Sequence, residues 1–372
     1  MYRQKSSLGL VRGIILMLSA IAVGVICAYL SDKQTEKNKK DEPHQDVAIL
    51  NWNSDDPDSS YNELVELLLK KTSRIAVSGV RKLEWKDVCK YNFWVDNFYI
   101  WESQNSGLTV YEFVYKDDAA DSRNMKRRVD EEVDDIISCI PEDADDWQVL
   151  LTVHDELIKR ITYDETAEAP HTFDIYGALV NHRAVCQGYA YAMSYIACQL
   201  GLDSSEVYSD THVWSKLPGI KSTEQYIDVT WDDPDEYDEF GRPYILHDCF
   251  CLKKDEMEGL EEHKTSDDEK DRQSGSGTGD NYFRRMGYYI PSGEKSRLEA
   301  IVTQQYESSS NMIEVRFEAA GDFTDAEYDI LDVIENLGYE GHYFIWENDS
   351  QQSISIGLYA SQPQESEEAE AV

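Results

Sequence analysis

The feature that most constrains this chain is a pair of short segments, 211–215 and 225–231, in which apolar and polar residues alternate. Alternation with a period of two predicts β-strands, and a proline and a glycine between the segments favour a turn. If the hairpin is centred near Ile220, His212 and Asp228 lie directly opposite each other and share one face. The sequence therefore predicts a hydrogen-bonded histidine–aspartate pair on an antiparallel hairpin.

A second constraint is the position of Cys186, which precedes alanine-rich sequence that continues to Leu200 and stops at Gly201. This pattern predicts a helix that begins at the cysteine, where free N–H groups and the helix dipole favour a thiolate. A cysteine at a helix start, or a histidine–aspartate pair, is by itself more often structural. The order and spacing of all three favour catalysis, with Cys186 as nucleophile, His212 as base and Asp228 as the acid that orients the base.

The same region carries several short motifs, which are His154-Asp155, Tyr163-Asp164, Tyr176-Gly177-Ala178-Leu179, Ala184-Val185-Cys186-Gln187-Gly188-Tyr189-Ala190, His212-Val213-Trp214 and Asp228-Val229-Thr230-Trp231-Asp232-Asp233-Pro234. In this combination the stretch 154–234 resembles bacterial proteins of the transglutaminase-like superfamily. One departure is Ser215, which stands where the family commonly has asparagine after the His-x-Trp motif.

This resemblance implies an α+β fold with a papain-like, transglutaminase-like core, in which the helix bearing the cysteine packs on an antiparallel sheet bearing His and Asp. It also implies a triad of Cys186, His212 and Asp228 that transfers acyl groups from protein or peptide substrates through a thioester. This chemistry needs no cofactor and no metal. Gln187 and Trp214 are candidates for substrate binding or for the oxyanion site.

Two function hypotheses follow. In the first, the protein is a cysteine acyl-transfer enzyme, with water as acceptor in a cysteine peptidase or amidase and a lysine amine as acceptor in a crosslinking enzyme. In the second, the same fold serves as a non-catalytic, membrane-tethered binding module. The complete set of three residue types favours the enzyme, because a binding role does not require them in register. The sequence predicts neither the physiological substrate nor the oligomeric state.

The chain is predicted to contain seven parts, which are a cationic tail (1–12), a transmembrane signal anchor (13–30), a polar linker (31–47), an α+β region (48–145), the transglutaminase-like core (146–292, with a mobile loop at 265–281), an α/β appendage (293–360) and an acidic tail (361–372). Residue spacing predicts helices at 61–71, at 123–139, after 145 and at 324–337, and strands at 92–101, 108–115, 311–317, 342–346 and 353–359.

The anchor prediction rests on an uninterrupted apolar run at 13–30 that follows a short basic tail. The run is just long enough to cross a bilayer, and no small-x-small pattern ends it as a signal-peptidase site would. We therefore predict an uncleaved, single-pass anchor in the cell membrane, with the folded body on the extracytoplasmic side.

Composition excludes some partners. The formal net charge of -38 repels nucleic-acid phosphates and anionic lipid surfaces, so no nucleic-acid partner is expected. The seven cysteines contain no CxxC pair and no disulfide framework of the small secreted kind. With 41% apolar residues and 24 tyrosines, most of the chain is expected to fold.

Three other features have a plain structural interpretation that is favoured over a functional one. His154, on a predicted helix, reads as a core or surface histidine and not as a ligand. Asp232 and Asp233 read as a turn after a strand and not as a metal site, because no histidine is at a fitting spacing. Cys249 and Cys251 form a CxC pair that reads as two buried thiols.

Overall fold

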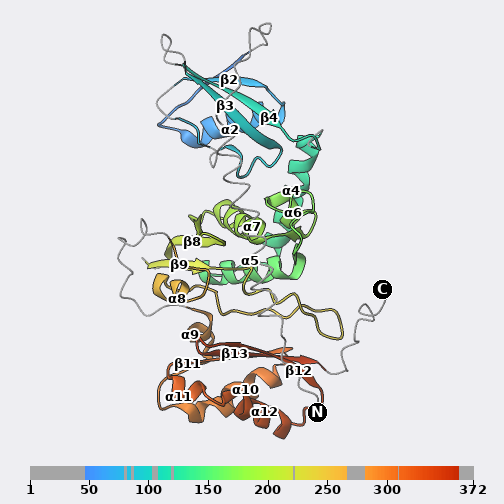
Figure 1. Cartoon of the computed structure of the whole chain (residues 1–372), viewed down its shortest axis with the longest axis vertical. Helices are drawn as coiled ribbons and strands as arrows, with labels where there is room; N and C mark the ends of the chain where they lie inside the picture. The colour runs from blue at the N-terminus through green and yellow to red at the C-terminus, as the bar shows by residue number, and fades with distance from the viewer. Residues whose placement is uncertain are drawn as a thin grey trace.

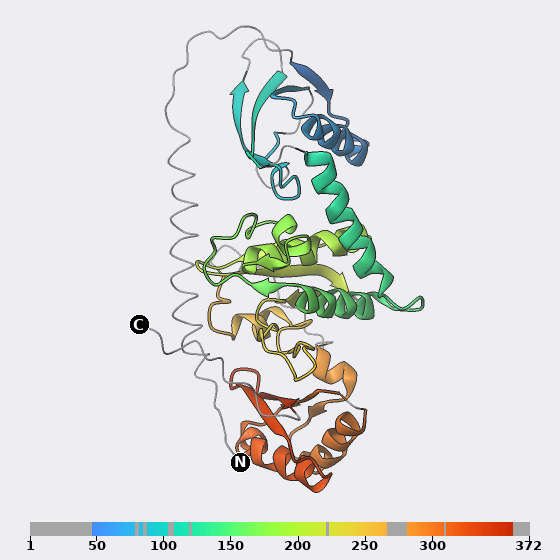
Figure 2. The same ribbon diagram turned by 90° about the vertical axis from the view of Figure 1, so that its right-hand side faces the viewer.

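The computed structural model describes residues 47–78, 82–84, 88–102, 108–118, 121–220, 223–265, 281–308 and 310–359. These residues form three parts stacked along the long axis of the molecule (Figures 1 and 2). The predicted acidic tail and nearly all of the predicted linker and mobile loop lie outside the described residues. The domain boundaries remain predictions.

The prediction of a membrane anchor is corrected here. None of the helices that the structure describes has the length and apolar character needed to cross a bilayer. The segment to which the anchor was assigned, 13–30, lies outside the described residues. The predicted fold class is therefore wrong in including an anchor, as are the single-pass and cell-membrane assignments. The described residues form a mixed α/β fold with several sheets.

The N-terminal part is a four-stranded sheet with one helix against it (Figure 1). Its elements are β1 (Ala48–Asn51), α2 (Pro57–Leu69), β2 (Arg74–Ser78), β3 (Val95–Glu102) and β4 (Leu108–Tyr115). The strand order is β1-β2-β4-β3, with β1 and β2 parallel and the other pairs antiparallel. Leu64 and Leu68 of α2 are fully buried, as the helical spacing of the apolar residues predicts.

The middle part combines helices with a three-stranded antiparallel sheet, β7-β8-β9. Its elements are α4 (Ser122–Ser138), α5 (Asp146–Arg160), β5 (Thr162–Tyr163), α6 (Ile175–Leu179), β6 (Arg183–Ala184), α7 (Cys186–Gln199), β7 (Ser205–Tyr208), β8 (Val213–Ile220), β9 (Thr223–Ile227), α8 (Lys254–Glu258) and α9 (Tyr282–Met286). Asp145 begins α5 with a capping box that pairs it with Gln148. Helix α7 packs against β8, which brings the predicted site together.

The C-terminal part is a second four-stranded sheet with helices on one face (Figure 1). Its elements are β10 (Tyr289–Ile290), η2 (Lys295–Arg297), α10 (Leu298–Glu307), β11 (Met312–Phe317), α11 (Ala320–Phe323), α12 (Ala326–Asn336), β12 (His342–Asn348) and β13 (Ser353–Tyr359). The order β10-β11-β13-β12, with its first pair parallel, repeats the pattern of the N-terminal sheet.

Strand β11 has two different buried faces. Ile313, Val315 and Phe317 belong to the apolar cluster that the sheet shares with its own helices. Glu314 and Arg316 alternate with them, so they point to the opposite face, toward the middle part, and they too are buried. The C-terminal sheet therefore meets the middle part through buried charged side chains.

Candidate active site

Helix α7 places Cys186 at its first position. Val185 precedes the helix in an extended conformation and provides no side-chain cap, so no capping side chain satisfies the N–H groups that begin α7. A Cβ on Gly188 would lie 2.6 Å from the Cβ of Ala184 and 3.0 Å from the carbonyl oxygen of Thr172. Only glycine therefore lets the first turn pack this closely against its surroundings.

Strand β8 lies beside the start of α7. Cys186, Ala190 and Val213 form a small apolar cluster between helix and strand. Ser215, the residue that departs from the family pattern, donates a hydrogen bond from Oγ to the carbonyl oxygen of Ala190 at 3.2 Å. The serine therefore ties the strand to the helix.

The hairpin of β8 and β9 differs in register from the prediction. Ser215 pairs with Ile227, so His212 is offset by two residues from Asp228 along the ladder and is not directly opposite. The ladder is irregular near the turn, where β8 contains a proline that has no N–H to donate. A shift of two keeps side chains on the same face, so the two residues still meet diagonally.

His212 and Asp228 form a direct contact just outside the strand ends. Nε2 of His212 lies 2.5 Å from Oδ2 of Asp228. The other carboxylate oxygen, Oδ1, accepts hydrogen bonds from the backbone N–H groups of Thr230 and Trp231 at 3.0 and 3.3 Å. Burial opposes ionisation of Asp228, but the neighbouring histidines outweigh burial and hold the pKa of this carboxyl well below its usual range.

The second imidazole on this carboxylate belongs to His263, which the sequence analysis did not single out. Nε2 of His263 lies 2.7 Å from Oδ2 of Asp228. The ring packs between Trp214 and Trp231, with centroid separations of 4.8 Å to each. Burial is the main cause that lowers the pKa of His263, which favours a neutral ring that donates to Asp228 through Nε2–H. No local pattern marks this histidine, because it follows a short helix among charged residues.

The remaining nitrogen of His212 is available for chemistry. Nδ1 is buried and makes no hydrogen bond to any residue that the structure describes. Burial disfavours the charged ring, but the Asp228 carboxylate and the Cys186 thiol outweigh it and raise the pKa of His212 well above its ordinary value. The structure therefore places a histidine whose charged form is favoured beside a cysteine at a helix start, which is the setting that a nucleophilic cysteine requires.

The two further candidates are both engaged in contacts within the protein. Gln187 donates from Nε2 to the carbonyl oxygen of Phe173 at 3.0 Å, which commits its amide to a structural contact. Trp214 is 1% exposed and stacks on His212 with a centroid separation of 6.0 Å. Their predicted role in substrate binding remains a prediction.

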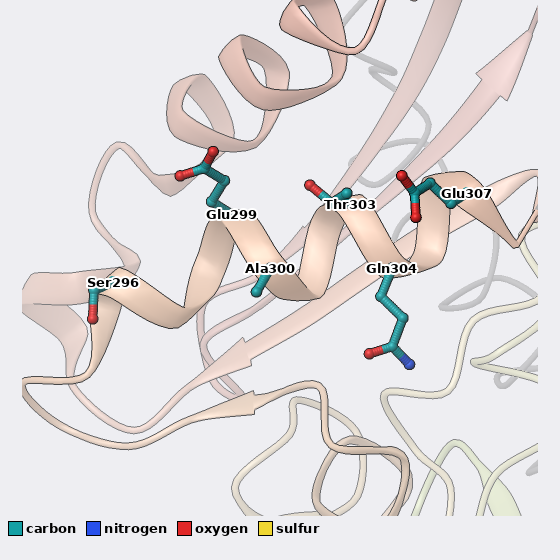
Figure 3. Close-up of a pocket in the computed structure, with 6 residues that line it drawn as sticks. All are labelled: Ser296, Glu299, Ala300, Thr303, Gln304 and Glu307. Carbon is teal, nitrogen blue, oxygen red and sulfur yellow. The ribbon is translucent and has the colours of Figure 1, made fainter.

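The thiol is the part of the predicted triad nearest the surface. Cys186 is 9% exposed, whereas His212 is 4% and Asp228 only 1% exposed. A shallow depression of about 530 Å³ lies elsewhere, along α10, between Ser296 and Glu307 (Figure 3). None of its lining residues belongs to the predicted triad.

A separate group of buried histidines and carboxylates, called here the second histidine cluster, lies between the middle and C-terminal parts. It consists of His154, Asp155, Asp232, His247 and Glu314. The groups His154–Asp155–His247 and His212–Asp228–His263 are the two sets in the described residues with enough neighbouring ligand atoms to hold a metal ion. Asp232 was predicted to form only a turn, but the fold brings its carboxylate to His154, which is 78 residues away in the sequence.

No family model and no curated protein matches this sequence. Among solved structures, a transglutaminase matches at 15% identity and a TM-score of 0.26, over 52% of this chain and 62% of that one. Menin, in a structure of its binding site for the Mixed Lineage Leukemia protein, matches at 19% identity and a TM-score of 0.25, over 36% and 30%. A candidate cysteine protease from Cytophaga hutchinsonii matches at 11% identity and a TM-score of 0.24, over 40% and 65%.

These neighbours are distant in sequence and in structure. The chain spans less than two thirds of each of the three proteins. They include a transglutaminase fold and a cysteine-protease fold, and membership of the transglutaminase-like superfamily stays a prediction from the sequence motifs.

Proposed function

We propose that this protein is a cysteine acyl-transfer enzyme that acts on amide bonds of proteins or peptides. The observation that carries the proposal is the asymmetric environment of His212. One ring nitrogen is bound to the buried carboxylate of Asp228, and the other is buried without a hydrogen bond beside Cys186. A structural histidine in the core usually has both nitrogens satisfied.

The proposed reaction has two halves. The Cys186 thiolate attacks the amide carbonyl carbon, and His212 gives its proton to the departing amine, so a thioester replaces the C–N bond. His212, now neutral, then takes a proton from water or from an amine that attacks the thioester. The new acyl bond forms, the C–S bond breaks, and the thiolate and imidazolium are restored.

The oxyanion of each tetrahedral intermediate requires donors that are fixed before the reaction. The backbone N–H of Cys186 opens α7 and is proposed as one of them. Asp228 does not take up the proton in this scheme. It holds the imidazole in place and stabilises its charged form, and four donors fix its own position.

The group that accepts the acyl chain decides the reaction: water gives hydrolysis and an amine gives crosslinking. A non-catalytic binding module would transfer the acyl group to neither acceptor. A fluorescent glutamine-containing peptide separates them: release of ammonia without amine uptake indicates hydrolysis, and incorporation of a dansylated amine indicates crosslinking. An unreactive thiol with no acyl transfer to either acceptor favours the binding module.

The proposal is tested with a substoichiometric iodoacetamide probe on the folded protein, followed by peptide mass spectrometry. We expect Cys186 to be labelled ahead of the exposed thiol of Cys139, and Cys186→Ala to remove this fast labelling. Cys139→Ala is the matched control and leaves the fast labelling unchanged. Equal labelling of the two thiols, or fast labelling that survives Cys186→Ala, contradicts the assignment.

A further inference from the structure

The second histidine cluster is built around one carboxylate. Oδ1 of Asp155 lies 2.9 Å from Nδ1 of His154 and 3.3 Å from Nε2 of His247. The outer nitrogens of the two rings each meet another carboxylate: Nε2 of His154 lies 3.1 Å from Asp232, and Nδ1 of His247 lies 2.8 Å from Glu314. Side-chain exposure is at most 8% for all members except Asp155, which is 25% exposed.

The proton count of this arrangement is unusual. A neutral imidazole carries one N–H. If each outer nitrogen donates to its carboxylate, each inner nitrogen presents a lone pair to Asp155, which is itself an acceptor. Two lone pairs and a carboxylate oxygen that converge at about 3 Å require a cation between them, either two extra protons or one metal ion.

We infer that the second histidine cluster is a binding site for a divalent first-row transition metal such as Zn²⁺, with His154, Asp155 and His247 as ligands. Two imidazoles and a carboxylate are ligands typical of Zn²⁺, at bond lengths of about 2.0–2.1 Å. The edge of a tetrahedron with such bonds is about 3.3 Å, and the observed ligand separations of 2.9 and 3.3 Å are already close to it.

The surroundings of the rings support the same assignment. Histidines that bind metals nearly always donate their other N–H to a carboxylate or carbonyl, which fixes the tautomer and the ring orientation. Both rings have this partner, Asp232 for His154 and Glu314 for His247. The ring of Tyr282 also stacks on His247 at 3.8 Å with an interplanar angle of 7°, so the orientation of this ligand is fixed from two sides.

Charge distinguishes this cluster from the catalytic one. Three carboxylates contact its two imidazoles, those of Asp232 and Glu314 buried and that of Asp155 partly exposed, so the cluster has a surplus of acidic groups that a dication offsets. His263 and His212 instead share one carboxylate, so that site has no comparable surplus. The metal would link α5 to the residues after Asp232 and, through Glu314, to the C-terminal sheet.

The test is calorimetric titration of ZnCl₂ into the full-length protein at pH 7.5 after treatment with chelator and dialysis. We expect one equivalent to bind, with release of protons from the rings. Absorption of a Co²⁺ complex should show the intense visible bands of a tetrahedral site. His247→Gln should weaken binding at least a hundredfold, and Glu314→Gln about 10- to 100-fold because it removes only the orienting carboxylate.

His342→Gln on β12 is the matched control and should bind Zn²⁺ as the wild type does. His263→Gln should also leave binding unchanged, which separates this site from the catalytic cluster. If His247→Gln does not fold, the isosteric Glu314→Gln decides. The inference is overturned if no Zn²⁺ binds at 100 µM, if the His247 and Glu314 variants bind it as the wild type does, or if His263→Gln loses binding. The contacts in the cluster are then hydrogen bonds of protonated histidines.

Discussion

Two clusters in this molecule share one motif, a carboxylate oxygen that contacts two imidazoles. In the cluster around the proposed triad, which is called the catalytic cluster for the role proposed above and consists of Cys186, His212, Asp228 and His263, that oxygen is Oδ2 of Asp228. In the second histidine cluster it is Oδ1 of Asp155. Both clusters lie in or beside the middle part of the fold, and both are buried.

The difference between the two lies in the outer nitrogens of the rings. In the second histidine cluster both outer nitrogens meet buried carboxylates. In the catalytic cluster the outer nitrogen of His212 is buried beside a thiol and has no hydrogen-bond partner among the described residues. The proposed catalysis therefore depends not on a His–Asp contact, which both sites have, but on a histidine nitrogen that has no hydrogen-bond partner among the described residues.

The difference between the two clusters is tested most directly by His154→Ala, measured by urea denaturation in the presence of chelator. Removing one member of a buried charged network leaves the others uncompensated, which lowers the free energy of unfolding by about 3–5 kcal/mol. That is more than a hundredfold in the ratio of folded to unfolded protein. His342→Ala is the control and should cost less than about 1 kcal/mol. If both variants cost the same, the second histidine cluster does not stabilise the fold.

A second prediction concerns the catalytic cluster and its pH dependence. The Asp228 carboxylate raises the pKa of His212 well above its ordinary value, so the proposed mechanism has a charged ring beside Cys186 at neutral pH. The rate at which Cys186 is alkylated in the wild-type protein should therefore fall less than tenfold between pH 8 and pH 6. In His212→Ala it should fall about 75-fold, as for a free thiol with a pKa near 8.5.

This measurement follows the peptide that contains Cys186 by mass spectrometry, with Cys139 as an internal reference in each sample. His154→Gln should behave as the wild type does, since its ring has no contact with the thiol in the described structure. A wild-type profile that matches that of Cys139 would contradict the assembled pair.

The smallest expected effect tests His263 as a positioning residue. His263→Gln removes a neutral donor from Asp228, and we expect turnover of a nitrophenyl ester to fall about fivefold, the factor that corresponds to about 1 kcal/mol for one hydrogen bond. Asp228 then acts on His212 alone, so the pKa of His212 should rise further in an NMR titration. A change in rate without a change in this titration would indicate that His263 only fills space between two tryptophans.

The sequence predicted local elements better than long-range contacts. Helix α7 begins at Cys186 as its spacing indicates, because the pattern of apolar residues and the stop at Gly201 are local signals. The hairpin was also found, yet its register was wrong by two residues, since a bulge near the turn depends on how a proline fits the ladder. Local patterns carry no information about such irregularities.

The sites show the same limit. Period-two alternation was enough to place His212 and Asp228 on one face. It could not show that His263, 35 residues beyond the aspartate, returns to the same carboxylate. Nor could it show that Asp232, interpreted as a turn, meets His154, because that contact depends on the packing of α5 and not on residue spacing.

The contact between His247 and Glu314 has a consequence for how the chain folds. These residues are 67 positions apart, whereas His212 and Asp228 are only 16 apart. Short loops close at a lower entropic cost and sooner than long ones. The hairpin that holds His212 and Asp228 can therefore form early, and the ring of His247 acquires its second carboxylate only when the C-terminal sheet docks. Quenched-flow hydrogen-exchange labelling at these two places would consequently report two different rates of protection within one folding reaction.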